Sequence, residues 1–146
     1  MGQEKLETMF KPKFLNVLLF WVIKYIVFFV VLAFIGDRFK SLVIKNSNNT
    51  RELIANTGYY SLYILFYTLI PVIVFSIPFY FTLKVKNPIY FVLLISAILV
   101  VEYLLYTNLA STMELMNGVY NGILTIVFLL LFFYRSIFLI FTKQEK

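Results

Sequence analysis

Residues 14–35 read FLNVLLFWVIKYIVFFVVLAFI, an apolar run with one charged side chain, Lys24, near its middle. A helix needs about 20 apolar residues to cross the hydrocarbon core of a bilayer. The run is also longer than the apolar core of a secretory signal peptide, which has about 7–15 residues. Segment 14–35 is therefore predicted to be a retained transmembrane helix.

Three more apolar runs of sufficient length follow, at residues 59–83, 89–108 and 119–141. Because backbone polar groups inside lipid must be satisfied within their own segment, each run is predicted to be helical. The connections are short, which makes sequential helices antiparallel neighbours. Residues 1–146 are thus predicted to form one all-α integral membrane domain, a four-transmembrane-helix bundle with up-down topology.

The composition excludes most soluble and enzymatic classes. Hydrophobic residues make up 62% and charged residues 14% of the chain, against about 45–50% and 25% in soluble domains. There is no Cys and no His, which removes thiolate ligands, disulfides and the usual proton-transfer residue near neutral pH. No phosphate-binding loop, nucleophile motif or metal-ligand cluster is present. The sequence predicts no enzyme activity, no cofactor and no metal site.

The net charge of +6 comes from lysines and arginines that gather at the ends of the apolar runs. This distribution suits anionic lipid headgroups and gives no sign of nucleic-acid binding. An even number of spans places both termini on one side, with seven basic residues against four on the other. They are Lys5, Lys11, Lys13, Lys84, Lys86, Lys143 and Lys146 against Arg38, Lys40, Lys45 and Arg51. Because cytoplasmic loops carry the excess of basic residues, both termini are predicted to be cytoplasmic, in a bacterial cytoplasmic membrane.

Three ionisable residues lie inside the predicted spans: Lys24, Glu102 and Arg135. A charge at mid-bilayer is disfavoured by about 2.5–3.5 kcal/mol on insertion scales, so such residues usually find a partner or face water. At about 1.5 Å per residue, Lys24 and Glu102 lie about 15 and 20 Å from the surface nearest the N-terminus, and Arg135 about 9 Å. The sequence predicts that Lys24 meets Glu102 and that Arg135 extends to the headgroups. The pair either stabilises one subunit or lines a polar path or a subunit interface.

Two aromatic neighbours accompany this pair. Tyr106 follows Glu102 by one helical turn, so its hydroxyl is predicted to donate to the carboxylate. Trp21 shares a helical face with Lys24 and is predicted to make a cation–π contact.

The second span contains Pro71 and Pro78, seven residues apart. Each proline removes a backbone donor, which predicts a kink or loosened helix over Leu69–Ile77. Prolines are also common in membrane helices as packing features. The region is either a hinge or an ordinary packing element. Tyr60, Tyr63 and Tyr67 share one face with the prolines, and this face is either a groove or subunit contact or an aromatic core.

Gly118 and Gly122 form a small-xxx-small pattern at the start of the fourth span, with Asn121 beside them. Such a pattern allows close helix approach with amide hydrogen bonds. A turn entering the span explains the glycines equally well.

The connection over residues 36–58 is the only sizeable polar segment. Residues 37–45 are predicted to form a short amphipathic helix at the membrane surface. Residues 46–50 read as a turn, after which Thr50 is predicted to cap a second short helix over Arg51–Ala55.

Function is predicted only by class. The leading hypothesis is a small homo-oligomeric ion channel or pore, with a toxin- or defence-effector-like use as one biological role. It depends on the charges inside the spans and on the proline-containing span. The alternative is a non-conducting accessory or immunity subunit that binds another membrane protein. A small transporter ranks third, because no internal repeat is visible.

Overall fold

The computed structural model describes residues 12–35, 37–109 and 115–142. Within these ranges the chain is helical apart from short connections, and it has no strand. The elements are α2 (Phe14–Ile35), the π-helix η1 (Lys40–Ile44), α3 (Thr50–Thr82), α4 (Pro88–Leu109) and α5 (Leu115–Thr142). Four of these helices are long and apolar enough to span a membrane. They indicate an all-helical membrane protein, as the sequence predicts.

The predicted spans agree closely with the helices except at the start of the second. Helix α2 covers the predicted residues, and α4 and α5 extend theirs by a few residues. Helix α3 begins at Thr50 and continues to Thr82 without interruption. The prediction of a separate short helix capped by Thr50 is therefore wrong, because those residues are the first turns of α3.

The N-cap of α3 is Asn49. The backbone N–H of Glu52 donates to Asn49 Oδ1 at 2.9 Å, and the backbone N–H of Asn48 donates to Glu52 Oε2 at 2.8 Å. The first bond satisfies a donor that the first turn leaves without a partner, and the second ties the residue before the cap to Glu52. Together they start the helix nine residues before the apolar run begins.

Replacing the cap should loosen this first turn. Asn49→Ala is expected to destabilise it by about 1 kcal/mol, because the Glu52 amide loses its acceptor. Amide hydrogen exchange of residues 50–55 measures the effect. Asn48→Ala is the matched control, since Asn48 contributes its backbone amide to this network. Equal protection in the two variants would contradict the assignment of the cap.

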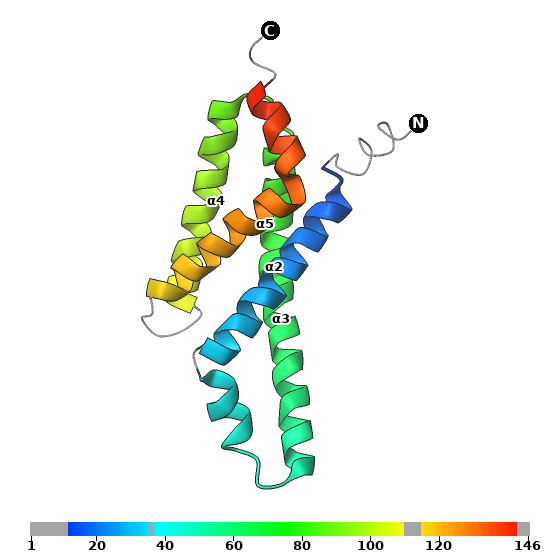
Figure 1. Ribbon diagram of the computed structural model, residues 1–146, viewed down its shortest axis with the longest axis vertical. Helices are drawn as coiled ribbons and strands as arrows, with labels where there is room; N and C mark the ends of the chain where they lie inside the picture. The colour runs from blue at the N-terminus through cyan, green and yellow to red at the C-terminus, as the bar shows by residue number, and fades with distance from the viewer. Residues whose placement is uncertain (1–11, 36, 110–114, 143–146) are drawn as a thin grey trace.

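The connection before α3 folds back onto it. Asp37 starts this return in the left-handed region, with a φ of 50°. Val43 of η1 is buried, and Asn56 Nδ2 of α3 donates to Asn46 O at 3.2 Å and to Ser47 Oγ at 3.0 Å. We call residues 37–63 the η1–α3 hairpin. In Figure 1 it extends beyond the lower ends of α4 and α5.

The predicted amphipathic helix of this connection is only partly observed. Its helical core is the short π-helix η1, and Val43 is its buried residue. Leu42, the apolar residue before it, is exposed. The buried side of the segment faces α3, which explains why the two neighbours differ.

The core lies where α2 crosses α3 and α5. Helix α2 packs against both of these helices, α5 packs against α4, and the contact between α3 and α4 is small. Phe20 of α2 stacks on Phe79 of α3 with ring centroids 4.8 Å apart, and its ring also meets Phe133 of α5 edge to face at 5.6 Å. Figure 1 shows the start of α2, the α3–α4 connection and the end of α5 at the same end of the molecule.

Candidate functional site: a buried ion cluster

Lys24 of α2 and Glu102 of α4 form an ion pair in the middle of the protein. Lys24 Nζ lies 2.6 Å from Glu102 Oε1, and both side chains are fully buried. The two residues are 78 positions apart in the sequence. Their contact joins α2 to α4 within a single chain.

Three polar side chains complete the site, two from α5 and one from α2. Asn121 Oδ1 accepts from Lys24 Nζ at 2.5 Å, while Asn121 Nδ2 donates to Glu102 Oε1 at 3.2 Å. The Thr125 hydroxyl donates to Glu102 Oε2 at 2.8 Å, and the Tyr25 hydroxyl donates to Oε1 at 2.5 Å. We call these five residues the ion cluster.

The ion cluster satisfies its own charges. The Lys24 ammonium has three donors. Two of them bind Glu102 and Asn121, and the ammonium also lies 3.9 Å from the centre of the Tyr25 ring. Both carboxylate oxygens accept hydrogen bonds. A buried ion pair is tolerated only when its remaining hydrogen-bonding groups are satisfied in this way. The cluster has no net charge and all five side chains are buried.

The aromatic neighbours are placed differently from one another. Trp21 lies with its ring centre 5.2 Å from Lys24 Nζ, within the range of a cation–π contact. Tyr106 contributes its ring, packed edge to face on Phe28 at 4.9 Å. The phenol that donates to Glu102 belongs to Tyr25. The carboxylate points towards α2 and α5, whereas Tyr106 lies one turn farther along α4.

Gly118 and Gly122 differ in how closely the neighbouring helix approaches them. A Cβ on Gly118 would lie 2.5 Å from Thr107 Oγ1 and 2.7 Å from Tyr103 Cδ2 of α4. Gly118 therefore allows α5 to approach α4 closely. A Cβ on Gly122 would have no neighbour within 4 Å. No other helix that the structure describes comes this close to Gly122, and a helix contact at Gly122 stays a prediction.

Arg135 lies outside the ion cluster. It is half-buried and follows Asn121 by 14 residues on α5, which is about 21 Å along the helix axis. Its extension to headgroups stays a prediction.

Pro71 and Pro78 do not interrupt α3, which is helical through both. Pro71 is buried and Pro78 is exposed. Near them the hydroxyl of Ser76 donates to Val72 O, and that of Thr82 donates to Pro78 O at 2.8 Å. The predicted loosening over Leu69–Ile77 is not observed as a break in the helix, and a hinge function stays a prediction.

Sequence reasoning missed Tyr25 and Thr125. A signal for Thr125 exists, because Asn117, Asn121 and Thr125 recur every four residues and all three are buried. Such a stripe marks one face of a helix. Tyr25 gives no comparable signal, because adjacent residues point in directions about 100° apart on a helix of 3.6 residues per turn. Tyr25 joins the ion cluster through its own hydroxyl, which reaches Glu102 Oε1.

The side chains of this site hold neighbouring helices together. In the ranges that the structure describes, no group of three or more His, Cys, Asp or Glu residues is placed to bind a metal. The ion cluster instead links α2, α4 and α5 through one carboxylate. In comparisons with protein-family models, curated proteins and solved structures, nothing matches this chain.

Proposed function

We propose that the chain is an up-down four-helix bundle that crosses a bacterial cytoplasmic membrane four times, with both termini in the cytoplasm. The shared end of α2, the α3–α4 connection and α5 supports this arrangement. Lys13, Lys84 and Lys86 lie at that end, and the excess of basic residues there depends on lysines 5, 11, 143 and 146, which are outside the described residues.

Within that membrane we propose a non-conducting accessory or immunity subunit, without enzymatic activity, that binds another membrane protein. The observation that carries this proposal is the closure of the ion cluster. Lys24 and Glu102 have no exposed surface, and each is bound by residues of the same chain. Charged side chains contribute to a conducting path only where they face water or a symmetry axis. The two charges at mid-depth offer neither.

The η1–α3 hairpin supplies the surface for a partner. The 33 residues of α3 extend about 50 Å, against about 30 Å of hydrocarbon in a bilayer. The first turns of α3 therefore project into water together with η1. Leu42 is 54% exposed, Ile54 70% and Tyr59 73%. Apolar and tyrosine side chains exposed on a projecting segment are typical of protein–protein interfaces.

A small pocket organises this surface. It has a volume of about 260 Å³, and Leu42, Tyr59 and Tyr63 are among the residues that line it. Hydrogen bonds of Asn56 to the turn hold the two sides of the hairpin in place. The surface is thus preformed, which reduces the entropy lost on binding.

Site-specific photo-crosslinking in the native host tests this proposal. A photoreactive residue at position 59 should give one defined crosslinked protein, and Leu42→Glu should abolish it by placing a charge in the pocket. Arg51→Glu, an exposed change on the same hairpin, should leave the crosslink intact. A probe at Ile123, which is exposed on α5, should give lipid adducts alone. Equal adducts at 59 and 123 would show that the hairpin binds no partner.

A homo-oligomeric pore is the second candidate, and one observation favours it. Tyr63 and Tyr67 are exposed on α3 with ring centroids 4.3 Å apart, so hydroxyl groups line part of an outward face. Several copies that turn this face to a common axis would enclose them. Purified protein in planar bilayers decides between the candidates. Conductance above that of empty bilayers would support the pore, and Pro71→Ala with Pro78→Ala would then test whether α3 bends during opening.

A further inference from the structure

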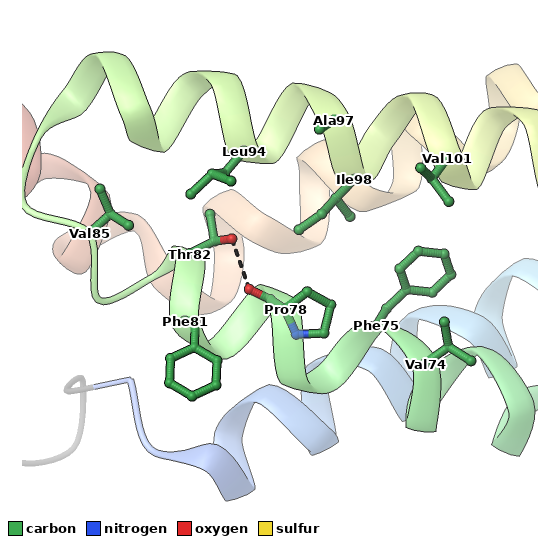
Figure 2. A pocket seen from close by; sticks show the side chains of 10 residues that line it. All are labelled: Val74, Phe75, Pro78, Phe81, Thr82, Val85, Leu94, Ala97, Ile98 and Val101. Atoms are coloured by element: carbon green, nitrogen blue, oxygen red, sulfur yellow. Dashed lines mark hydrogen bonds between the residues drawn. The ribbon is translucent and has the colours of Figure 1, made fainter.

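A long apolar groove separates α3 from α4 on the outside of the bundle. Its larger part has a volume of about 550 Å³ and is shown in Figure 2. A second part of about 400 Å³ adjoins it, and the two share Val74 and Phe75. The groove exists because α3 and α4 make little direct contact, and Ala97 places a short side chain on its α4 wall. Its open side faces away from the other helices.

The walls of the larger part are apolar. Thr82 has the only polar side chain among the lining residues, and its hydroxyl already donates to Pro78 O, as the dashed line in Figure 2 shows. None of the residues that line this part has an unpaired polar side-chain atom that could bind a ligand. The occupant must therefore present hydrocarbon to these walls.

The larger part of the groove fits one leaflet of a bilayer. It begins at Val85 in the α3–α4 connection and ends on α4 at Val101, which follows Ile89, the first residue of the predicted span, by 12 residues, or about 18 Å along the helix. Half of the hydrocarbon core is about 15 Å thick. An acyl chain that enters from the membrane surface would fill this part from its mouth to the depth of Val101.

The mouth of the groove carries positive charge. Val85 lines the groove at the α3–α4 connection, and the exposed residues Lys84 and Lys86 precede and follow it in the sequence. The Lys84 ammonium lies 4.1 Å from the centre of the ring of Tyr80, which is near the end of α3. Among the residues that the structure describes, the carboxylates are Asp37, Glu52 and Glu102, and none of them is at this end.

We infer that the groove holds one acyl chain of an anionic phospholipid, whose phosphate is bound by Lys84 and Lys86. The apolar walls favour a hydrocarbon chain over a polar ligand. The length of the groove matches the thickness of one leaflet, and the two lysines favour a negatively charged headgroup. The site is separate from the η1–α3 hairpin, which lies at the opposite end of the molecule. It therefore does not depend on the partner proposed above.

Native mass spectrometry of the detergent-solubilised protein tests this inference. Phosphatidylglycerol and phosphatidylcholine with identical acyl chains are titrated separately, and glycerol 3-phosphate serves as the headgroup alone. We expect one retained phosphatidylglycerol per chain. Two lysines near the surface favour it over phosphatidylcholine by about 10- to 30-fold. Glycerol 3-phosphate should not be retained.

Two pairs of variants separate the groove from the headgroup site. Ala97→Trp fills the groove and should abolish retention, whereas Val100→Trp adds the same side chain at an exposed position of α4 that does not line the groove and should leave retention unchanged. Lys84→Gln with Lys86→Gln should bring phosphatidylglycerol down to the level of phosphatidylcholine. Lys40→Gln with Lys45→Gln, at the other end, should not. Equal retention of the two lipids by the unaltered protein, or unchanged retention in Ala97→Trp, would overturn the inference. A dimer that Ala97→Trp dissociates would assign the groove to a second copy of the chain.

Discussion

Replacing Lys24 with Met is expected to lower the free energy of unfolding by about 3–5 kcal/mol. The substitution removes the donor 2.6 Å from Glu102 Oε1 and the donor to Asn121 Oδ1. Glu102 would then be a buried carboxylate without a counter-ion. Unfolding followed in bicelles by steric trapping measures the change. Lys40→Met is the control for loss of a lysine, because Lys40 is exposed and lies outside the ion cluster and the proposed lipid site.

A double-mutant cycle shows how much of this loss belongs to the pair. Glu102→Gln removes the charge and keeps the shape of the side chain. Lys24→Met combined with Glu102→Gln should therefore be more stable than Lys24→Met alone. Residues in direct contact show coupling energies of about 0.5–3 kcal/mol. Additive effects would mean that the two side chains contribute independently, against the geometry of the ion cluster.

Gly118→Ala is expected to destabilise the protein by about 1–3 kcal/mol through overpacking. The new Cβ would meet Thr107 Oγ1 at 2.5 Å and Tyr103 Cδ2 at 2.7 Å, so these side chains or α5 itself must shift. The displacement would also disturb the ion cluster, because Asn121 follows Gly118 by one turn. The same unfolding measurement detects the loss.

Gly122→Ala is the matched control, four residues away on the same helix. Its Cβ would have no neighbour within 4 Å, and alanine is favoured over glycine inside helices by about 0.8–1.0 kcal/mol. This variant should be as stable as the unaltered protein or more so. If both glycine variants behaved alike, α4 and α5 would not be in close contact at Gly118.

The helices and the contact between the two charges follow from simple properties of the sequence. An apolar run of about 20 residues is long enough to cross a bilayer, and residues 14–35 form such a run. Depth along a helix depends only on residue number, which is why Lys24 and Glu102 are predicted at similar levels. These arguments use only the distance along the helix axis, which can be calculated from residue numbers.

The sequence does not determine how each helix is rotated about its own axis. Tyr106 and Tyr25 are both within reach of Glu102 by position, and the direction of the carboxylate decides which hydroxyl donates. Gly118 and Gly122 lie one turn apart on α5, yet only a Cβ on Gly118 would come within 4 Å of α4 side chains. The early start of α3 is hidden for another reason. The segment before residue 59 is polar and contains Gly58, so its helix depends on the Asn49 cap and on packing against Val43.

The distance in sequence between Lys24 and Glu102 also sets an order on biogenesis. Helix α2 is synthesised 78 residues before the carboxylate that pairs with its lysine. The apolar residues of α2 each favour insertion by about 0.3–0.6 kcal/mol, which outweighs the penalty of one lysine. The nascent protein therefore enters the bilayer with an ammonium that has no counter-ion. That group is neutralised when α4 arrives, and it is fully bonded only when Asn121 of α5 follows. A chain truncated before α4 keeps this lone charge in the membrane, which distinguishes an unfinished molecule from a complete one.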